Sequence, residues 1–278
     1  MSVTLLEIRG LSIDKTHDPL ITNATFKIFA GSPSSAGEIV LIQGANGSGK
    51  SSIFKSLLTR QNPFRKPFNS LFSMKKKGQR NQDLTWVKEY FSFNGVEIKT
   101  QDDYTWFKSQ ISYVEQTDDQ WTARTPRELF NQTNHLSHQP LTKDALELKI
   151  TSLLIYFGLD SEILNRRLTS SKLSGGEKRL IRIINGFIPN VEFYMFDEPI
   201  NNMDYAKAYK FSEYLKTLTQ QGKSILLITH CRLFLPPINR SYQIRHQSLI
   251  QNTRPVEPCR LSNDGELECD QSLEISHG

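Results

Sequence analysis

Residues 38–52 read EIVLIQGANGSGKSS: a short apolar run, a glycine-rich loop and the first turn of a helical pattern. Residues 44–51, GANGSGKS, match the spacing G-x-x-x-x-G-K-S at every fixed position, between a strand and a helix as that motif requires. The glycines let backbone amides close around phosphate oxygens, and the N-terminus of the helix adds its dipole. The expected phosphate-binding residues are Gly44, Ala45, Asn46, Gly47, Ser48, Gly49, Lys50, Ser51 and Ser52.

Two side chains of this loop bring a cation and a hydroxyl to the expected phosphates. Lys50 would reach the β- and γ-phosphates of a nucleotide, and the hydroxyl of Ser51 would ligate Mg²⁺. A glycine-rich turn that binds nothing is the alternative. The complete motif, with both flanks correct, argues against that alternative, so we expect a nucleotide site.

A pair of acids follows a second apolar strand, in VEFYMFDEP at residues 191–199. A carboxylate at Asp197 can hold Mg²⁺ through water, and Glu198 beside it can polarise the attacking water. General-base assistance of this kind contributes about 10²–10⁴ in rate. Taken alone, such a pair is more often a strand end with two solvated acids. Together with the phosphate loop it favours the metal and general-base roles.

Gln116 and His230 each end a further short strand, in SYVEQ and LLITH. Two of the apolar strands flank a helical pattern at 206–219, which indicates a parallel sheet. Ligand sites in such sheets gather at the carboxyl ends of the strands. The amide of Gln116 would therefore contact Mg²⁺ or the water, and we expect His230 to assist catalysis. A lone histidine at a strand end is otherwise more often a plain polar terminus.

A second glycine turn occurs far downstream, in KLSGGEKRL at residues 172–180. By itself, Ser-Gly-Gly before a helix is a weak sign of an anion site, and a helix cap would explain it. The order of the motifs is more specific: the phosphate loop, then Gln116, LSGGE, the two acids, Asp204 and His230. This order resembles the nucleotide-binding subunit of an ABC (ATP-binding cassette) ATPase, as found in ABC transporters. The resemblance covers residues 3 to about 250, and LSGGE is the family's distinguishing signature.

The resemblance implies an α/β fold: a P-loop NTPase core with a mixed, mainly parallel sheet, an N-terminal antiparallel β subdomain and an inserted helical subdomain. The ATPase domain would span residues 1–252, with the helical subdomain at about 120–175, and an acidic extension would follow at 253–278. The implied cofactors are ATP and Mg²⁺, and the implied activity is ATP hydrolysis. The matching residues are Lys50 and Ser51 of Walker A, Gln116 of the Q-loop, Asp197 and Glu198 of Walker B, Asp204 of the D-loop and the switch histidine His230.

Two cassettes pair head to tail in this family and enclose two ATP molecules. Ser174, Gly175 and Gly176 would then contact the γ-phosphate of the ATP held by the other subunit, and Asp204 would join the nucleotide contacts. The chain carries one copy of each motif, so the resemblance implies a second cassette, identical or related, as a partner. Integral membrane transport subunits are the other implied partners.

Several positions depart from the family pattern. In LSIDKTHDPL, Lys15 and His17 stand where the family commonly has an aromatic residue that stacks on adenine, so we expect base stacking to be weak or supplied by His17. Ile200 stands where a threonine is usual after the two acids. Leu180 and Asn185 stand where arginines are usual after the signature. None of these changes removes a catalytic group, so we expect active hydrolysis with altered tuning.

The composition fits an ordinary soluble globular protein of 278 residues, 37% hydrophobic and 23% charged. No apolar run reaches the ~18 residues of a membrane span, and the N-terminus lacks the order of a signal peptide. Three cysteines, few and odd in number, favour a reduced cytosolic protein. Cys259 and Cys269 lack a matching cluster of metal-binding residues. We expect a cytoplasmic protein, which the resemblance places at the cytoplasmic face of a membrane.

Charge is unevenly spread along the chain, whose formal net charge is +5. A basic insert at about 61–88 interleaves aromatic residues with cations, whereas the charged residues beyond 255 are mostly acidic. For the insert we favour a flexible solvated loop over a contact with a partner or a membrane surface. A nucleic-acid platform requires such interleaving, but it is the least favoured alternative.

Two functions remain open from the sequence. The first is the ATPase subunit of an ABC transporter with separate membrane-spanning chains. The second is a non-transport ABC ATPase that acts on nucleic acid, the ribosome or a protein complex. Translation-type members usually carry two cassettes in one chain and chromosome-maintenance members carry long coiled coils. Neither feature is present here, so we favour the transporter subunit.

Overall fold

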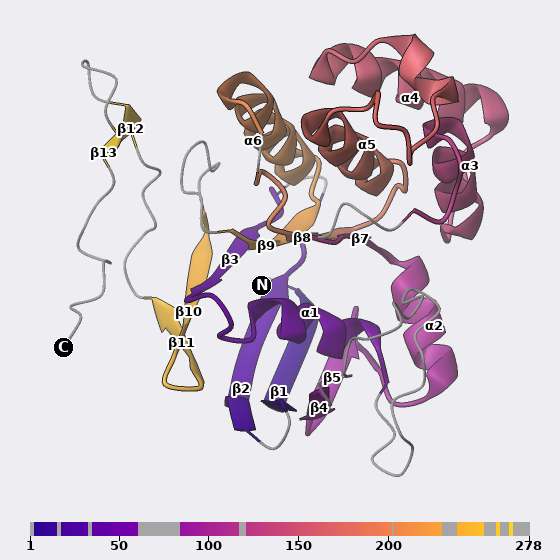
Figure 1. The fold of residues 1–278 in the computed structure, drawn as a ribbon. Coiled ribbons are helices and arrows are strands. Elements are labelled where there is room, and N and C mark those ends of the chain that lie inside the picture. The colour runs from indigo at the N-terminus through magenta and orange to yellow at the C-terminus, as the bar shows by residue number, and fades with distance from the viewer. Residues whose placement is uncertain are drawn as a thin grey trace, which may run out of the picture.

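A six-stranded sheet forms the centre of the molecule (Figure 1). The computed structural model describes residues 3–15, 18–32, 35–60, 84–116, 121–201, 203–229 and 238–252, and the backbone of 260–261 and 267–268. The strand order is β11-β10-β3-β9-β8-β7, and all neighbours are parallel except β11, which runs antiparallel to β10. The strands are β3 (Ile39–Gly44), β7 (Ile111–Val114), β8 (Phe193–Asp197), β9 (Ser224–Ile228), β10 (Arg240–Arg245) and β11 (Ser248–Asn252).

The central strands are buried on both faces, and their alternate residues enter two different cores. Tyr194 and Phe196 of β8 point into the core beneath the helices, whereas Phe193 and Met195 point into the core shared with the second sheet. Because side chains alternate across a strand, an unbroken apolar run is what a doubly covered strand requires. The parallel arrangement predicted from the apolar strands is therefore confirmed.

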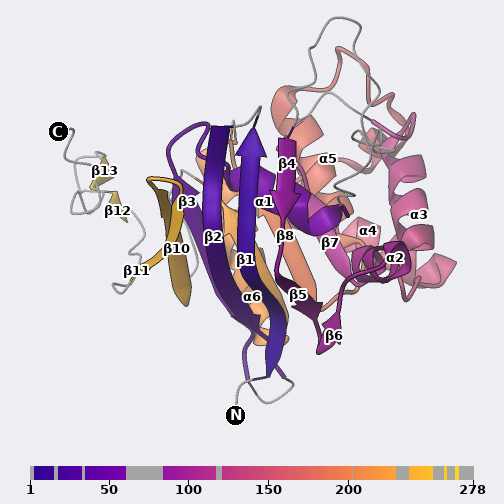
Figure 2. The same ribbon diagram turned by 90° about the horizontal axis from the view of Figure 1, so that it is seen from below.

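The second sheet is antiparallel and covers the lower face of the first. Figure 2 shows β1 and β2 side by side, with β4 and β5 paired along the other edge of β1. A turn at Asn94 and Gly95, both with positive φ, joins β5 to β6, as the Asn-Gly pair predicts. The strands are β1 (Thr4–Lys15), β2 (Asp18–Phe29), β4 (Leu84–Val87), β5 (Tyr90–Phe93) and β6 (Val96–Glu97).

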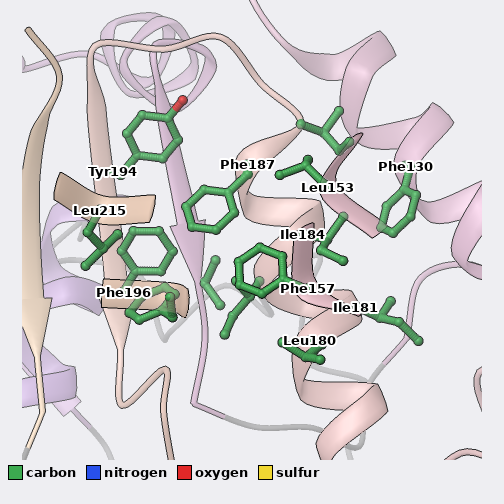
Figure 3. Close-up of a cluster of buried hydrophobic side chains, with 14 of the residues drawn as sticks. Phe130, Leu153, Phe157, Leu180, Ile181, Ile184, Phe187, Tyr194, Phe196 and Leu215 are labelled. Carbon is green, nitrogen blue, oxygen red and sulfur yellow. The ribbon is translucent and has the colours of Figure 1, made fainter. Parts of the chain in front are cut away.

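Four helices lie above the central sheet, and α1 lies between the two sheets (Figure 1). Rings and branched aliphatic side chains of α4, α5, α6 and β8 fill the upper core, with Phe187 at its centre (Figure 3). The helices are α1 (Lys50–Leu58), α2 (Gln101–Ser109), α3 (Pro126–Leu136), α4 (Lys143–Phe157), α5 (Gly175–Phe187) and α6 (Tyr205–Gln220), with a 3₁₀ turn at Ser161–Asn165. The expected α/β class with antiparallel and helical additions is confirmed.

The expectation for the insert at 61–88 was wrong at its end. Residues 84–87 form β4, which pairs with β1 so that Leu84 lies opposite Lys15 and Trp86 opposite Ile13. In this strand Leu84 and Trp86 are half-buried, while Thr85 and Val87 are exposed, the alternation of an edge strand on a buried face. Residues 61–83 lie outside the described part of the chain.

Of the extension at 253–278, only two short strands are described, β12 (Arg260–Leu261) and β13 (Leu267–Glu268), which pair with each other. The boundary of the ATPase domain at residue 252 stays a prediction. Within the described residues, every helix is too short or too polar to cross a membrane.

Candidate functional site

The loop after β3 forms the floor of the site. It turns through Gly47 and Gly49, with φ of 81° and 100°, and α1 begins directly after it at Lys50. The other described helices are each capped by a Ser, Thr or Asp side chain, but α1 is preceded by Gly49 and has no side-chain cap. An added Cβ at Gly47 would meet nothing within 4 Å. The first amides of α1 are thus left for an external anion, as a phosphate site requires.

Lys50 is folded back across this loop. Its Nζ donates to the carbonyls of Gly44 at 2.8 Å and Ala45 at 2.9 Å, and only 7% of the residue is exposed. Burial lowers the pKa of Lys50, while the nearby carboxylates of Glu198 and Asp197 raise it in part. The ammonium therefore lies over the loop with weak neutral partners, which phosphate oxygens can replace.

Asp197 and Ser51 meet at the end of β8 and the start of α1. Asp197 is 2% exposed, and its Oδ1 is buried without a hydrogen-bond partner. Burial raises the pKa of Asp197 to about 6, and its hydrogen bond with the Ser51 side chain opposes that rise. A buried, incompletely satisfied carboxylate beside a hydroxyl fits the oxygen ligands that Mg²⁺ takes.

Glu198 is held in a strained backbone conformation. Its φ is +48°, in the left-handed region that residues other than glycine seldom adopt. Its amide donates to the carbonyl of Ile228 on β9 at 2.8 Å, and its carbonyl accepts from Arg179 at 2.6 Å. Glu198 is 3% exposed, yet it forms part of the wall of the site's cavity. Strain of this kind persists only where neighbours hold it.

Lys50, Ser51 and Glu198 line a cavity of about 370 Å³, and Asp197 lies outside its lining. The loop, Gln116 and Glu198 line one part of it. Lys15, one of the two residues at the position of the usual adenine-stacking aromatic, lies on the cavity wall. His17, the other residue at that adenine-stacking position, lies outside the described residues, and so does His230. Three residues that the sequence did not predict also line the cavity: Leu20, Lys55 and Leu84. The described wall of the cavity has no aromatic ring.

The signature turn lies elsewhere. Ser174 caps α5: its Oγ accepts from the amide of Glu177 at 3.2 Å, and the Glu177 carboxylate accepts from the amide of Ser174 at 2.7 Å. Added Cβ atoms at Gly175 and Gly176 would meet nothing within 4 Å. None of these residues lines the cavity, because α5 packs into the upper core and α1 into the lower one. The predicted second phosphate turn is thus remote from the loop at 44–52 in its own chain.

Asp204 lies at the start of α6, exposed and outside the cavity lining. Its carboxylate accepts from the amide of Lys207 at 2.9 Å and pairs with the Lys207 Nζ at 2.7 Å. These two interactions lower the pKa of Asp204. In the described chain its contacts are those of a helix cap.

The departures from the family pattern have local structural explanations. Ile200 is 7% exposed and packs in the upper core. Leu180 is fully buried in the same core. Asn185 accepts a hydrogen bond from the Thr133 hydroxyl at 2.7 Å, which ties α5 to α3. All three positions contribute to packing of the helices and none contacts the cavity.

Comparison with known proteins finds similarity to ATP-binding proteins of transporters. The family model for ABC transporters matches residues 33–201, more than half of the chain. The ATP-binding protein EcfA1 of an energy-coupling factor transporter from Fusobacterium nucleatum is 26% identical over 233 residues, covering 82% of this chain and 74% of that protein. The ergothioneine transport ATP-binding protein EgtV of Helicobacter pylori is 25% identical, covering 70% of this chain and 78% of that protein.

Other relatives are longer. An ABC transporter ATP-binding protein of Clostridium perfringens is 27% identical over 258 residues, and this chain spans only 39% of its length. Among solved structures, an ATP-binding subunit of an ABC transporter superposes with a TM-score of 0.66 at 22% identity, over 90% of each chain. A dimeric cassette, MJ0796, bound to ADP and Pi superposes with a TM-score of 0.67 at 17% identity, over 91% of this chain and 98% of that one. These two likenesses establish the fold. With the family model covering more than half of its length, the chain belongs to the ABC transporter family, whose nucleotide-binding subunits hydrolyse ATP with Mg²⁺.

Proposed function

We propose that this ATPase works as one half of a cassette pair that closes around two ATP molecules and powers transport through separate transmembrane subunits. The separation of its two phosphate-binding turns carries the proposal. One turn, at 44–52, lines the cavity, whereas the other opens α5 with free space beside Gly175 and Gly176. A site that needs both turns must draw the second from another chain.

Within one site, the roles follow from the contacts. Lys50 exchanges the carbonyls of Gly44 and Ala45 for phosphate oxygens. Ser51 and Asp197, with the amide of Gln116, would hold Mg²⁺, which neutralises phosphate charge when bound.

The general base is assigned to Glu198, with His230 assisting. The backbone of Glu198 is fixed on both sides and the residue lies on the cavity wall, which supports a role for its carboxylate beside the terminal phosphate. The carboxylate accepts the proton of the water that attacks this phosphate. Fixing the base in advance removes the cost of orienting it during the reaction.

Mixing two inactive variants tests whether the site is shared. Lys50→Ala removes the phosphate loop's cation, and Ser174→Arg blocks the signature turn. In a mixed pair, one site combines both defects, but the other joins the intact Lys50 of one chain to the intact Ser174 of its partner. An equal mixture should recover about a quarter of wild-type turnover, because half of the pairs are mixed and each has one intact site. An inactive mixture, with active wild type, would contradict a shared site.

The transport role rests on the family and on the two relatives named for transport. We therefore expect the chain to lie at the cytoplasmic face of a membrane, held there by a multi-span membrane protein. Affinity purification from detergent-solubilised membranes should recover such a partner. A stable complex without any membrane protein, or ATPase stimulation by DNA or RNA with steep salt dependence, would instead support the non-transport alternative.

A further inference from the structure

A buried arginine connects the signature helix to the catalytic edge of the sheet. Arg179 lies on α5, five residues after its cap Ser174, and only 1% of the residue is exposed. Burying a cation is costly unless its donors are satisfied. The guanidinium meets that need with main-chain carbonyls from two separate loops, those of Glu115, Gln116, Asp197, Glu198 and Pro199.

The first loop follows β8 and contains the assigned base. Nη2 donates to the carbonyl of Glu198 at 2.6 Å and to that of Asp197 at 3.1 Å, and Nε donates to that of Pro199 at 2.8 Å. The left-handed φ of Glu198 is strained and needs fixed neighbours to persist. Arg179 supplies one of these, on the carbonyl side, while Ile228 holds the amide.

The second loop follows β7 and contains the Q-loop glutamine. Nη1 donates to the carbonyl of Glu115 at 2.7 Å and reaches that of Gln116 at 3.4 Å. Gln116 and Glu198 both line the cavity and come from neighbouring parallel strands. One planar guanidinium thus sets the spacing of two cavity-lining residues, a task suited to its rigid fork of donors.

The position of Arg179 around the helix explains why its side chain, and not that of Leu180, reaches the two loops. Successive helical residues point about 100° apart, so residues 179 and 180 face different surroundings. Leu180 is fully buried among the apolar side chains of the upper core, whereas Arg179 faces the carbonyls of the two loops. In this chain the cation stands one position before the arginine that the family pattern predicts.

We propose that Arg179 is a positioning residue for hydrolysis: it holds Glu198 and Gln116 in register with each other and with the N-terminus of α5. The proposal deepens the proposed function, because the base role of Glu198 belongs to that function. It also gives a physical connection between the signature turn at Ser174 and the chain's own cavity. A shift of α5 caused by a partner's phosphate reaches Glu198 and Gln116 through one side chain.

The test compares Arg179→Met and Arg179→Lys with the control Leu180→Met, an equally buried neighbour whose side chain has no donor for the loop carbonyls. Volume-conserving changes such as the control are well tolerated. We expect Arg179→Met to lower kcat about 10²-fold with KM for ATP nearly unchanged, because misplacing groups at a reacting centre lowers the rate by about that factor. Arg179→Lys keeps the charge but not the fork, so its kcat should fall between wild type and Arg179→Met.

Hydrogen exchange of the nucleotide-free protein gives a readout that needs no activity. Peptides covering 111–116 and 193–201 should both exchange faster in the Arg179 variants, while β1 and the control stay as in wild type. Should Arg179→Met fail to fold, Arg179→Lys supplies both readouts. Loops that exchange as in wild type, or equal kcat in Arg179→Met and Leu180→Met, would overturn the proposal. A folded wild type that does not hydrolyse ATP would instead contradict the proposed function, and the exchange experiment would still decide the role of Arg179.

Discussion

The two glycines that open α5 yield a prediction in which stability and function change in opposite directions. An added Cβ at Gly175 or Gly176 meets no atom within 4 Å, and neither glycine has a positive φ. Nothing within the described chain therefore requires a glycine at these positions. We expect Gly175→Ala and Gly176→Ala to fold normally and to be more stable than wild type.

The size of both effects follows from the structure. Replacing a glycine by alanine at a compatible backbone stabilises a protein by about 0.4–1 kcal/mol, because the unfolded chain loses conformational freedom. In the proposed pair, the same methyl group occupies the space through which a phosphate oxygen approaches the first amides of α5. A hydrogen bond to a charged group contributes about 1.5–3 kcal/mol, so each of the two sites that loses one weakens ATP-dependent pairing about 10- to 150-fold.

Three measurements check this prediction. Urea unfolding of the nucleotide-free protein gives the change in stability, and steady-state ATPase assays give turnover. Light scattering after size exclusion, with ATP and in the Glu198→Gln background, gives the association of the pair. Ser152→Ala is the control, because Ser152 is exposed on α4 and gains helix propensity without touching either phosphate turn.

The control separates stabilisation from the loss of a phosphate contact. Ser152→Ala should raise stability by up to about 0.5 kcal/mol and leave pairing and turnover unchanged. Glycine variants that pair and hydrolyse ATP as well as wild type would refute the proposed role of the signature turn. Glycine variants that are less stable than wild type would refute the argument from open space.

Three further predictions concern the proposed base, the cavity wall and the half-buried Lys88. Glu198→Gln should lower turnover about 10²–10⁴-fold and make an ATP-bound dimer persist in size exclusion; unchanged turnover would refute the assignment. Leu84→Ala should raise KM for ATP roughly fivefold, at about 1 kcal/mol of lost apolar contact, whereas Val87→Ala on the exposed side of β4 should not. Lys88 donates to the Ser56 carbonyl and the Tyr104 hydroxyl, and burial lowers its pKa from 10.5 to about 7. The native state then binds fewer protons than the unfolded state between about pH 7 and 10, so stability rises with pH there, by up to ~1.4 kcal/mol per unit. In Lys88→Met, the free energy of unfolding should rise less steeply between pH 6.5 and 9.5 than in wild type. Equal slopes in the two proteins would contradict the lowered pKa of Lys88.

The parts of the fold that the sequence predicted are those with strong local signals. The sequence TPRE at 125–128 combines a Thr cap, a Pro at the first helical position and a Glu three residues after the Thr, and α3 begins there with the Thr125 hydroxyl accepting from the Glu128 amide. The helix predicted at 206–219 is α6, one residue longer at each end. The phosphate loop after β3 and the two acids at the end of β8 lie at the same edge of the sheet, with β9 between them, because parallel strands end at one edge.

The parts that the sequence did not predict depend on distant pairing. β4 adds to β1 across about 70 residues, and no local pattern in LTWV specifies that partner. This pairing places Leu84 opposite Lys15, and both line the cavity. Arg179 was not predicted for a related reason. In KRLIRII, a cation beside apolar residues is typical of a solvated helix face, and Arg179 is buried only because the two loops fold against it.

The placement of α1 and α5 bears on how the two phosphate turns can act together. The two helices pack into different cores on opposite faces of one sheet, and strands β8 and β9 contribute alternate side chains to both. Bringing the signature turn to the chain's own phosphate loop would require one helix to leave its core and expose the apolar side chains that it buries there. A second chain can present its signature turn without any such change. Arg179 then matters because α5 serves two sites at once in the proposed pair: its N-terminus faces the partner's nucleotide, while its buried guanidinium holds Glu198, the proposed base of its own site.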